Sequence, residues 1–109
     1  MKSKIETYLG FCVRARKIVF GIDEIENQKK GVFLLIADGA LSENSFKVMQ
    51  KTQERLACPL IVTNADTLGI TLHKPAVKAV AIKDKHLADA IISIVNSESQ
   101  FKLYSGGTN

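Results

Sequence analysis

The chain has 109 residues, a formal net charge of +4 at pH 7 and hydrophobic residues at 46% of its positions. This length favours a single domain, and the hydrophobic fraction is typical of a globular core rather than of a disordered chain. No stretch approaches the ~20 apolar residues of a membrane span, and the first residues lack the apolar run of a signal peptide. We therefore expect one basic domain, a monomer outside the membrane, whose charge is compatible with a nucleic-acid partner.

Apolar periodicity predicts a helix, a strand and a second helix in the first third of the chain. The apolar residues of 2–15 recur on one face of a 3.6-residue period, which predicts the first helix. The short apolar run 18–20 then predicts a strand that Gly21 closes. Acidic residues crowd the start of 23–30 and lysines its end, so this segment is expected to be a helix that stops at Gly31.

The same alternation continues through the rest of the chain. The further expected elements are the strand 32–37, a helix from its cap Ser42 to Leu56, the strand 60–63, a short helix capped at Asp66, the strand 79–82 and a helix from its cap Asp84 to Val95. Alternation of this kind predicts an α/β fold: a three-layer α/β/α sandwich around a four-stranded mixed sheet with helices on both faces. We expect the domain to span 1–96.

The end of the chain is polar and is expected to form a tail. Residues 97–109 are rich in Ser and Gly, so we expect this segment to be partly disordered, with the last five residues unstructured. Three larger side chains within it are expected to dock on the body of the domain: Phe101, Leu103 and Tyr104.

No motif of the common catalytic or nucleotide-binding kinds is present. The chain has neither G-x-G-x-x-G after a predicted strand nor G-x-x-x-x-G-K-[ST], and it has no G-x-S-x-G. Cys12 and Cys58 stand in apolar surroundings without zinc spacing, so we expect buried reduced thiols and a cytoplasmic protein. We therefore expect no catalysis, no cofactor and no metal site. The α/β architecture alone leaves an enzyme as the weakest hypothesis.

The strongest functional signal is the stretch from residue 14 to residue 24. It begins with three cations: Arg14, Arg16 and Lys17. Gly21 then precedes a helix start, where unpaired N–H groups and the helix dipole favour anions. Asp23 and Glu24 have two interpretations, as helix-capping acids or, for Glu24, as an acceptor for guanine N–H groups. The cations and the glycine predict contact with an anionic polymer.

Two other segments offer further contacts. The loop 72–77 combines apolar and basic residues, including Leu72, His73, Lys74 and Pro75. Such a loop suits a splayed RNA base, although Leu72 and Val77 could instead belong to the core. In the helix 42–56, three cations one turn apart form a stripe that is either solvated or in contact with RNA: Lys47, Lys51 and Arg55.

An ordered series of segments resembles the bacterial YlxQ-like proteins, which belong to the superfamily of the archaeal ribosomal proteins L-seven-Ae and L-thirty-e. The series comprises Leu9-Gly-Phe-Cys-Val-Arg-Ala-Arg-Lys-Ile-Val-Phe-Gly, Val32-Phe-Leu-Leu-Ile-Ala-Asp, Ser42-Glu-Asn-Ser-Phe-Lys, Cys58-Pro, Thr67-Leu-Gly and Val80-Ala-Ile. The resemblance covers roughly residues 3–95. It implies an α/β/α sandwich that binds RNA, typically kink-turns, which are sharp bends flanked by sheared G·A pairs.

The resemblance also implies a set of contact residues. Gly21, Ile22 and Glu24 match the positions where the family meets the RNA bend, and the loop before the last strand matches the one that covers a flipped-out base. Asp23 stands where kink-turn binders carry asparagine, and Asn27 where they carry lysine. An ionised aspartate only accepts hydrogen bonds, and the lost lysine removes a phosphate contact.

We therefore expect a ribosome-associated protein, or a protein that binds another structured RNA, with ribosomal or translation-linked proteins as further partners. A protein-interaction module on the same fold is the alternative, because Asp23 and Asn27 remove two expected RNA contacts.

Overall fold

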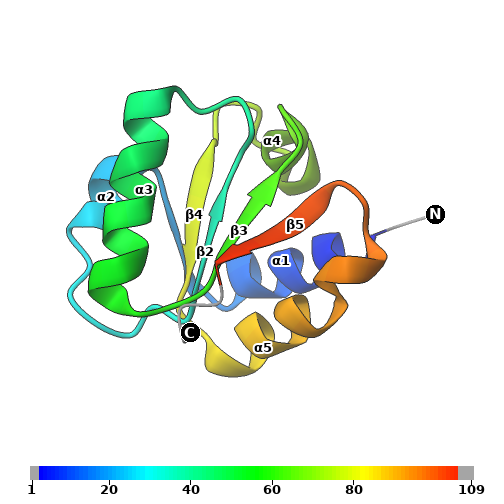
Figure 1. Ribbon diagram of the computed structural model, residues 1–109. Helices are drawn as coiled ribbons and strands as arrows, with labels where there is room; N and C mark the ends of the chain where they lie inside the picture. Colours follow the sequence, from blue (N-terminus) through cyan, green and yellow to red (C-terminus); the bar gives the residue numbers. More distant parts are fainter. Residues whose placement is uncertain (1–2, 106–109) are drawn as a thin grey trace.

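The computed structural model describes residues 3–105 and shows an α/β fold with one central sheet (Figure 1). In chain order its elements are α1 (Lys4–Arg14), β1 (Ile18–Phe20), α2 (Ile22–Glu26), β2 (Leu34–Ala37), α3 (Glu43–Leu56), β3 (Leu60–Thr63), α4 (Thr67–Leu72), β4 (Ala79–Ile82), α5 (Lys85–Ile94), the 3-10 turn Val95–Ser97 and β5 (Phe101–Ser105). The expected alternation of helices and strands is confirmed up to α5. The expectation that the last five residues are unstructured is wrong at Ser105, which ends β5, and its remainder, 106–109, lies outside the described residues.

The sheet is mixed, with the strand order β1-β4-β2-β3-β5. β2 and β3 run parallel, and every other neighbouring pair runs antiparallel. The register places Phe20 opposite Val80, so the end of β1 meets the start of β4. This pairing brings the segment after β1 beside the loop that leads into β4.

Helices cover both faces of the sheet, as the sequence predicts. α1, α4 and α5 bury one apolar cluster, which takes Leu34 and Ile36 from β2. α2 and α3 bury the other, which takes Leu35 and Ala37 from the same strand. Because successive side chains of a strand point to opposite faces, a strand buried on both sides reads as continuous apolar sequence. Figure 1 shows α2 and α3 on one side of the sheet and α1 and α5 on the other.

The sheet has five strands, not the four that the sequence predicts. The additional strand, β5, comes from the segment expected to be a tail, and it pairs antiparallel with β3 at one edge of the sheet. Phe101 is buried in the cluster under α1 and α5, as expected, whereas Leu103 is exposed. Tyr104 is half-exposed but docks on α3 as expected: its ring meets the Phe46 ring edge-on, and its hydroxyl accepts a hydrogen bond from the Gln50 side chain at 2.8 Å. The Glu98 carboxylate, just before β5, accepts a hydrogen bond from the Ile5 N–H at the start of α1. The segment 98–105 is therefore part of the folded domain.

The second helix is shorter than expected. α2 ends at Glu26 rather than near residue 30, and Asn27 forms its C-cap. The Arg55 guanidinium of α3 donates to the carbonyl oxygens of Gln28 at 2.7 Å and Glu26 at 2.9 Å. These bonds satisfy carbonyls that a longer helix would have used internally. Arg55, one member of the predicted basic stripe, thus has a structural partner.

Candidate nucleic-acid interface

The loop before β4 lies beside Gly21, as the predicted RNA site requires. The Gly21 N–H donates to the Ala79 carbonyl at 3.0 Å, which fixes the end of β1 against the start of β4. The Lys74 ammonium lies 5.5 Å from the centroid of the Phe20 ring, a cation–π arrangement. We call the segment Gly21–Glu24 together with the loop 73–78 the loop surface.

Gly21 itself forms the N-cap of α2, with φ of +89° and no side chain to supply a cap. This φ favours glycine, and apart from the two adjoining residues no described part of the chain lies within 4 Å of the position that a Cβ would take. The interpretation of Asp23 as the N-cap is therefore wrong, because both Asp23 and Glu24 lie in the first turn. Their side chains are exposed, while Ile25 anchors the helix in the core. The Glu24 carboxylate is thus accessible to a partner.

A pocket of about 250 Å³ lies between α1 and the end of α4. Arg14 and His73 both line it, and His73 Nε2 lies 3.1 Å from the Glu6 carboxylate. The Arg14 guanidinium lies 4.9 Å from the centroid of the Phe11 ring. Since His73 and Lys74 are neighbours in the chain, this pocket adjoins the loop surface on its α1 side.

Several predicted contact residues do not join the loop surface. Arg16 and Lys17 precede β1, so they lie at the opposite end of that strand from Gly21. The Lys17 carbonyl accepts a hydrogen bond from the N–H of Lys83, which directly follows β4. At ~3.3 Å per residue, Lys17 and Gly21 are ~13 Å apart. The Leu72 side chain is only 9% exposed and belongs to the core, as the alternative interpretation holds.

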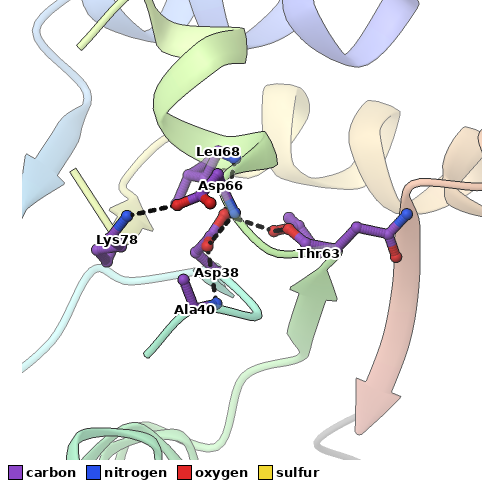
Figure 2. Close-up of polar contacts among 7 residues, drawn as sticks. Asp38, Ala40, Thr63, Asp66, Leu68 and Lys78 are labelled. Atoms are coloured by element: carbon purple, nitrogen blue, oxygen red, sulfur yellow. Dashed lines mark hydrogen bonds and ion pairs between the residues drawn. The ribbon is translucent and has the colours of Figure 1, made fainter. Parts of the chain in front are cut away.

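Buried Asp38, which follows β2, holds the neighbouring segments in place (Figure 2). Its side chain is 1% exposed. It accepts four hydrogen bonds of 2.7–2.9 Å, from the backbone N–H groups of Ala40, Asp66 and Leu68 and from the Thr63 hydroxyl. Burial by itself raises the pKa of the Asp38 carboxyl. The hydrogen bonds from Leu68, Ala40, Asp66 and Thr63 more than offset burial, so its pKa lies below the ordinary 3.8.

Asp38 performs the capping role that the sequence assigns to Asp66. Asp66 has φ of +64° and makes no side-chain cap at the start of α4. Its carboxylate instead lies 2.9 Å from the Lys78 ammonium, and this hydrogen bond raises the pKa of Lys78 (Figure 2). The unpaired N–H groups at the start of α4 are therefore satisfied by a carboxylate from a different part of the chain.

Gly69 brings α4 against the loop before β4. A Cβ at Gly69 would lie 2.9 Å from the Pro75 carbonyl oxygen and 3.0 Å from that of Lys74. The Lys74 N–H also donates to the Gly69 carbonyl at 2.9 Å. Asp38 therefore positions α4, and α4 positions the loop that carries Lys74.

The fold recurs in a solved structure. That structure, described as a protein with unknown function from Bacillus halodurans C, is 19% identical to this chain and superposes with a TM-score of 0.73. The match covers 87% of this chain and 99% of the other. No protein-family model and no curated protein matches the chain. At this level of identity, the similarity shows the α/β fold and carries no functional assignment.

One exposed apolar residue near the loop surface was not predicted from the sequence. Ile70 of α4 is 72% exposed, and its carbonyl accepts the His73 N–H at 3.1 Å, so it adjoins the loop surface. Its neighbours Leu68 and Leu72 are buried, and the helical period gave a weak signal that Ile70 points the other way. This exposed aliphatic side chain lies four residues before Lys74 in the chain.

The two cysteines lie in the interior of the domain. Cys12 and Cys58 are buried free thiols, as predicted. Burial raises the pKa of each to about 11, and the Asp84 charge adds to this effect at Cys12. Both thiols are therefore protonated near neutral pH, and the nucleophilic form is the thiolate. Within residues 3–105, no three His, Cys, Asp or Glu side chains gather as a metal site would need, and no helix is long and apolar enough to cross a membrane.

Proposed function

We propose that this chain is a non-catalytic RNA-binding protein that holds a structured RNA at the loop surface. The observation that carries the proposal is the contact between the two predicted RNA-binding segments, in which Lys74 lies over Phe20 and Gly21 bonds to Ala79. Exposed Lys74 suits a phosphate, exposed Ile70 suits an unstacked base, and the exposed Glu24 carboxylate suits the donor edge of a guanine. These are the parts of an RNA bend that the resemblance implies.

The finer form of the proposal is a kink-turn-like RNA and association with the ribosome. It rests on the resemblance of residues 3–95 to the YlxQ-like proteins. The exposed carboxylates of Asp23 and Glu24 oppose nonspecific phosphate binding, so a bent RNA that presents base donors is favoured over a plain duplex. A reduced, cytoplasmic setting is consistent with the two free thiols.

Binding to a kink-turn RNA and to a plain duplex, measured by fluorescence anisotropy across salt, tests the proposal. We expect tighter binding to the kink-turn, with affinity falling as salt rises from about 50 to 200 mM. Lys74→Glu is expected to weaken kink-turn binding about tenfold, since it removes a phosphate contact and adds repulsion. Glu24→Ala is expected to weaken it by a similar factor.

Lys102→Glu is the matched control for Lys74→Glu. Lys102 is also an exposed lysine, but it lies in β5, at the sheet edge opposite β1. Its reversal makes the same change in net charge and is expected to alter affinity less than twofold. Equal binding to both RNAs, or no binding to either, would contradict the structured-RNA proposal.

A protein-interaction module is the second candidate function. Three exposed carboxylates lie on the short helix α2: Asp23, Glu24 and Glu26. Such a face repels phosphates and suits a basic protein partner. Association that survives ribonuclease digestion and is lost on Asp23→Lys would support this function over RNA binding.

A further inference from the structure

Basic side chains gather at the end of the sheet opposite the loop surface. They come from the α1–β1 turn, from the segment after α2 and from the end of β4. We call them the sheet-end cluster: Arg16, Lys17, Lys29, Lys30 and Lys83. Four are exposed and Lys83 is half-buried.

Lys83 joins the three segments. Its N–H donates to the Lys17 carbonyl at 2.7 Å, which ties it to the turn before β1. Its ammonium donates to the Gln28 side chain at 2.6 Å, and its Cε lies 3.6 Å from the ideal Cβ position at Gly31. Lys29 and Lys30 lie between Gln28 and Gly31 in the chain. The five cations therefore occupy one continuous region of the surface, although up to 67 positions separate them in the sequence.

Among the residues that the structure describes, no ion pair neutralises the positive charge of this region. Within residues 3–105, the salt bridges involve His73, Lys78 and Lys85, and none involves a member of the cluster. Of the neighbouring acids, Asp84 accepts the Leu87 N–H as the cap of α5 and Asp89 pairs with Lys85. Glu26 is exposed at the end of α2. Five cations thus face few carboxylates, whereas the loop surface combines Lys74 with Asp23 and Glu24.

We propose that the sheet-end cluster is a second nucleic-acid contact, which binds the phosphate backbone of a double-helical RNA stem without reading its sequence. Ammonium and guanidinium groups bind phosphate oxygens, and such contacts position a protein on a duplex rather than specify bases. The ~13 Å between Lys17 and Gly21 is short enough for one RNA to contact both surfaces. This inference goes beyond the loop surface, and it can fail while the proposed RNA binding there holds.

A charge-reversal variant tests the proposal on a plain RNA duplex and on a kink-turn RNA with a long stem. Lys17→Glu, Lys29→Glu and Lys30→Glu are combined, leaving half-buried Lys83 intact. We expect duplex affinity to fall at least about tenfold and the slope of log K against log salt to lose about 2 to 3 units, since each phosphate contact adds about one. The kink-turn RNA is expected to show the same loss of slope.

The matched control combines Lys47→Glu, Lys51→Glu and Lys102→Glu, which change the net charge equally from exposed positions on α3 and β5. We expect this control to change the salt slope by less than one unit. Equal losses in both triple variants would overturn the proposal, because net charge alone would then account for them. A cluster variant that keeps its duplex affinity, while Lys74→Glu loses kink-turn binding, would also overturn it and leave the loop surface standing.

Folding of each variant is checked by thermal denaturation. A milder variant with Lys17→Gln, Lys29→Gln and Lys30→Gln removes the charge without adding repulsion. We expect it to give the same loss of salt slope with a smaller loss of affinity. An unchanged slope in this folded variant would overturn the proposal.

Discussion

Asp38→Ala is expected to destabilise the domain by about 4 kcal/mol, a large share of the stability of a chain this size. The substitution removes the acceptor for three backbone N–H groups and one hydroxyl. Leu68 is fully buried, so its N–H group loses its partner without access to water. Each such orphaned group costs about 1–3 kcal/mol. Urea denaturation followed by circular dichroism measures the difference.

The pH dependence of stability separates the contribution of the Asp38 charge from the contribution of the side chain's shape. The hydrogen bonds hold the pKa of Asp38 below 3.8 in the folded state, so folding favours the ionised form. This contribution is complete above the ordinary pKa and is lost as the pH falls from about 4 through the folded pKa. The stability difference between wild type and Asp38→Asn is therefore expected to shrink between pH 6 and pH 2.

Asp66→Asn is the control for this titration. Asp66 is an exposed aspartate beside the same turn, and asparagine tolerates its φ of +64°. Its ion pair with Lys78 faces solvent, so we expect the unfolding midpoint to change little at any pH. A stability difference between wild type and Asp38→Asn that stays constant across pH would contradict the assigned role of the Asp38 charge.

Most of the fold was predictable because the internal strands are largely apolar runs. β2 reads Leu-Leu-Ile-Ala and β4 reads Ala-Val-Ala-Ile, and both are buried on two faces. β5 gives no such signal, because among residues 101–104 only Phe101 is buried, the three residues after it are exposed, and the segment follows a polar stretch. An edge strand needs only one buried face and one neighbour, so its sequence resembles that of a docked tail.

The candidate site was predictable where chain neighbours stay neighbours in space. Gly21 and the start of α2 follow one another directly, and the loop 73–78 is placed by the strand it precedes. Arg16 and Lys17 lie close to Gly21 in sequence, but the extended β1 carries them to the other end of the sheet. The role of Asp38 could not be read from the sequence. Its donors lie up to 30 positions away, and only the folded chain brings them to one carboxylate.

The close approach of α4 to the loop before β4 allows a substitution that shifts the loop without changing any of its side chains. Gly69→Ala puts a methyl group within 3.0 Å of two carbonyl oxygens of the backbone, so the loop or the helix must shift. Overpacking of this kind costs about 1–3 kcal/mol, and the ~1 kcal/mol gain in helix propensity offsets only part of it. We expect a net loss of up to about 2 kcal/mol and weaker kink-turn binding, because the shift moves Lys74 and Ile70 relative to Gly21.

Gly10→Ala is the matched control, and it is expected to have the opposite effect on stability. Gly10 also lies inside a helix, but the nearest atom to a new Cβ is the end of the flexible Arg14 side chain, at 3.8 Å. With no clash, the propensity gain of ~1 kcal/mol should raise the free energy of unfolding. Thermal denaturation and RNA anisotropy on both variants give the comparison. If Gly69→Ala were as stable as Gly10→Ala and bound RNA like the wild type, α4 would not fix the loop, and the chain of contacts from Asp38 to Lys74 would have no bearing on binding.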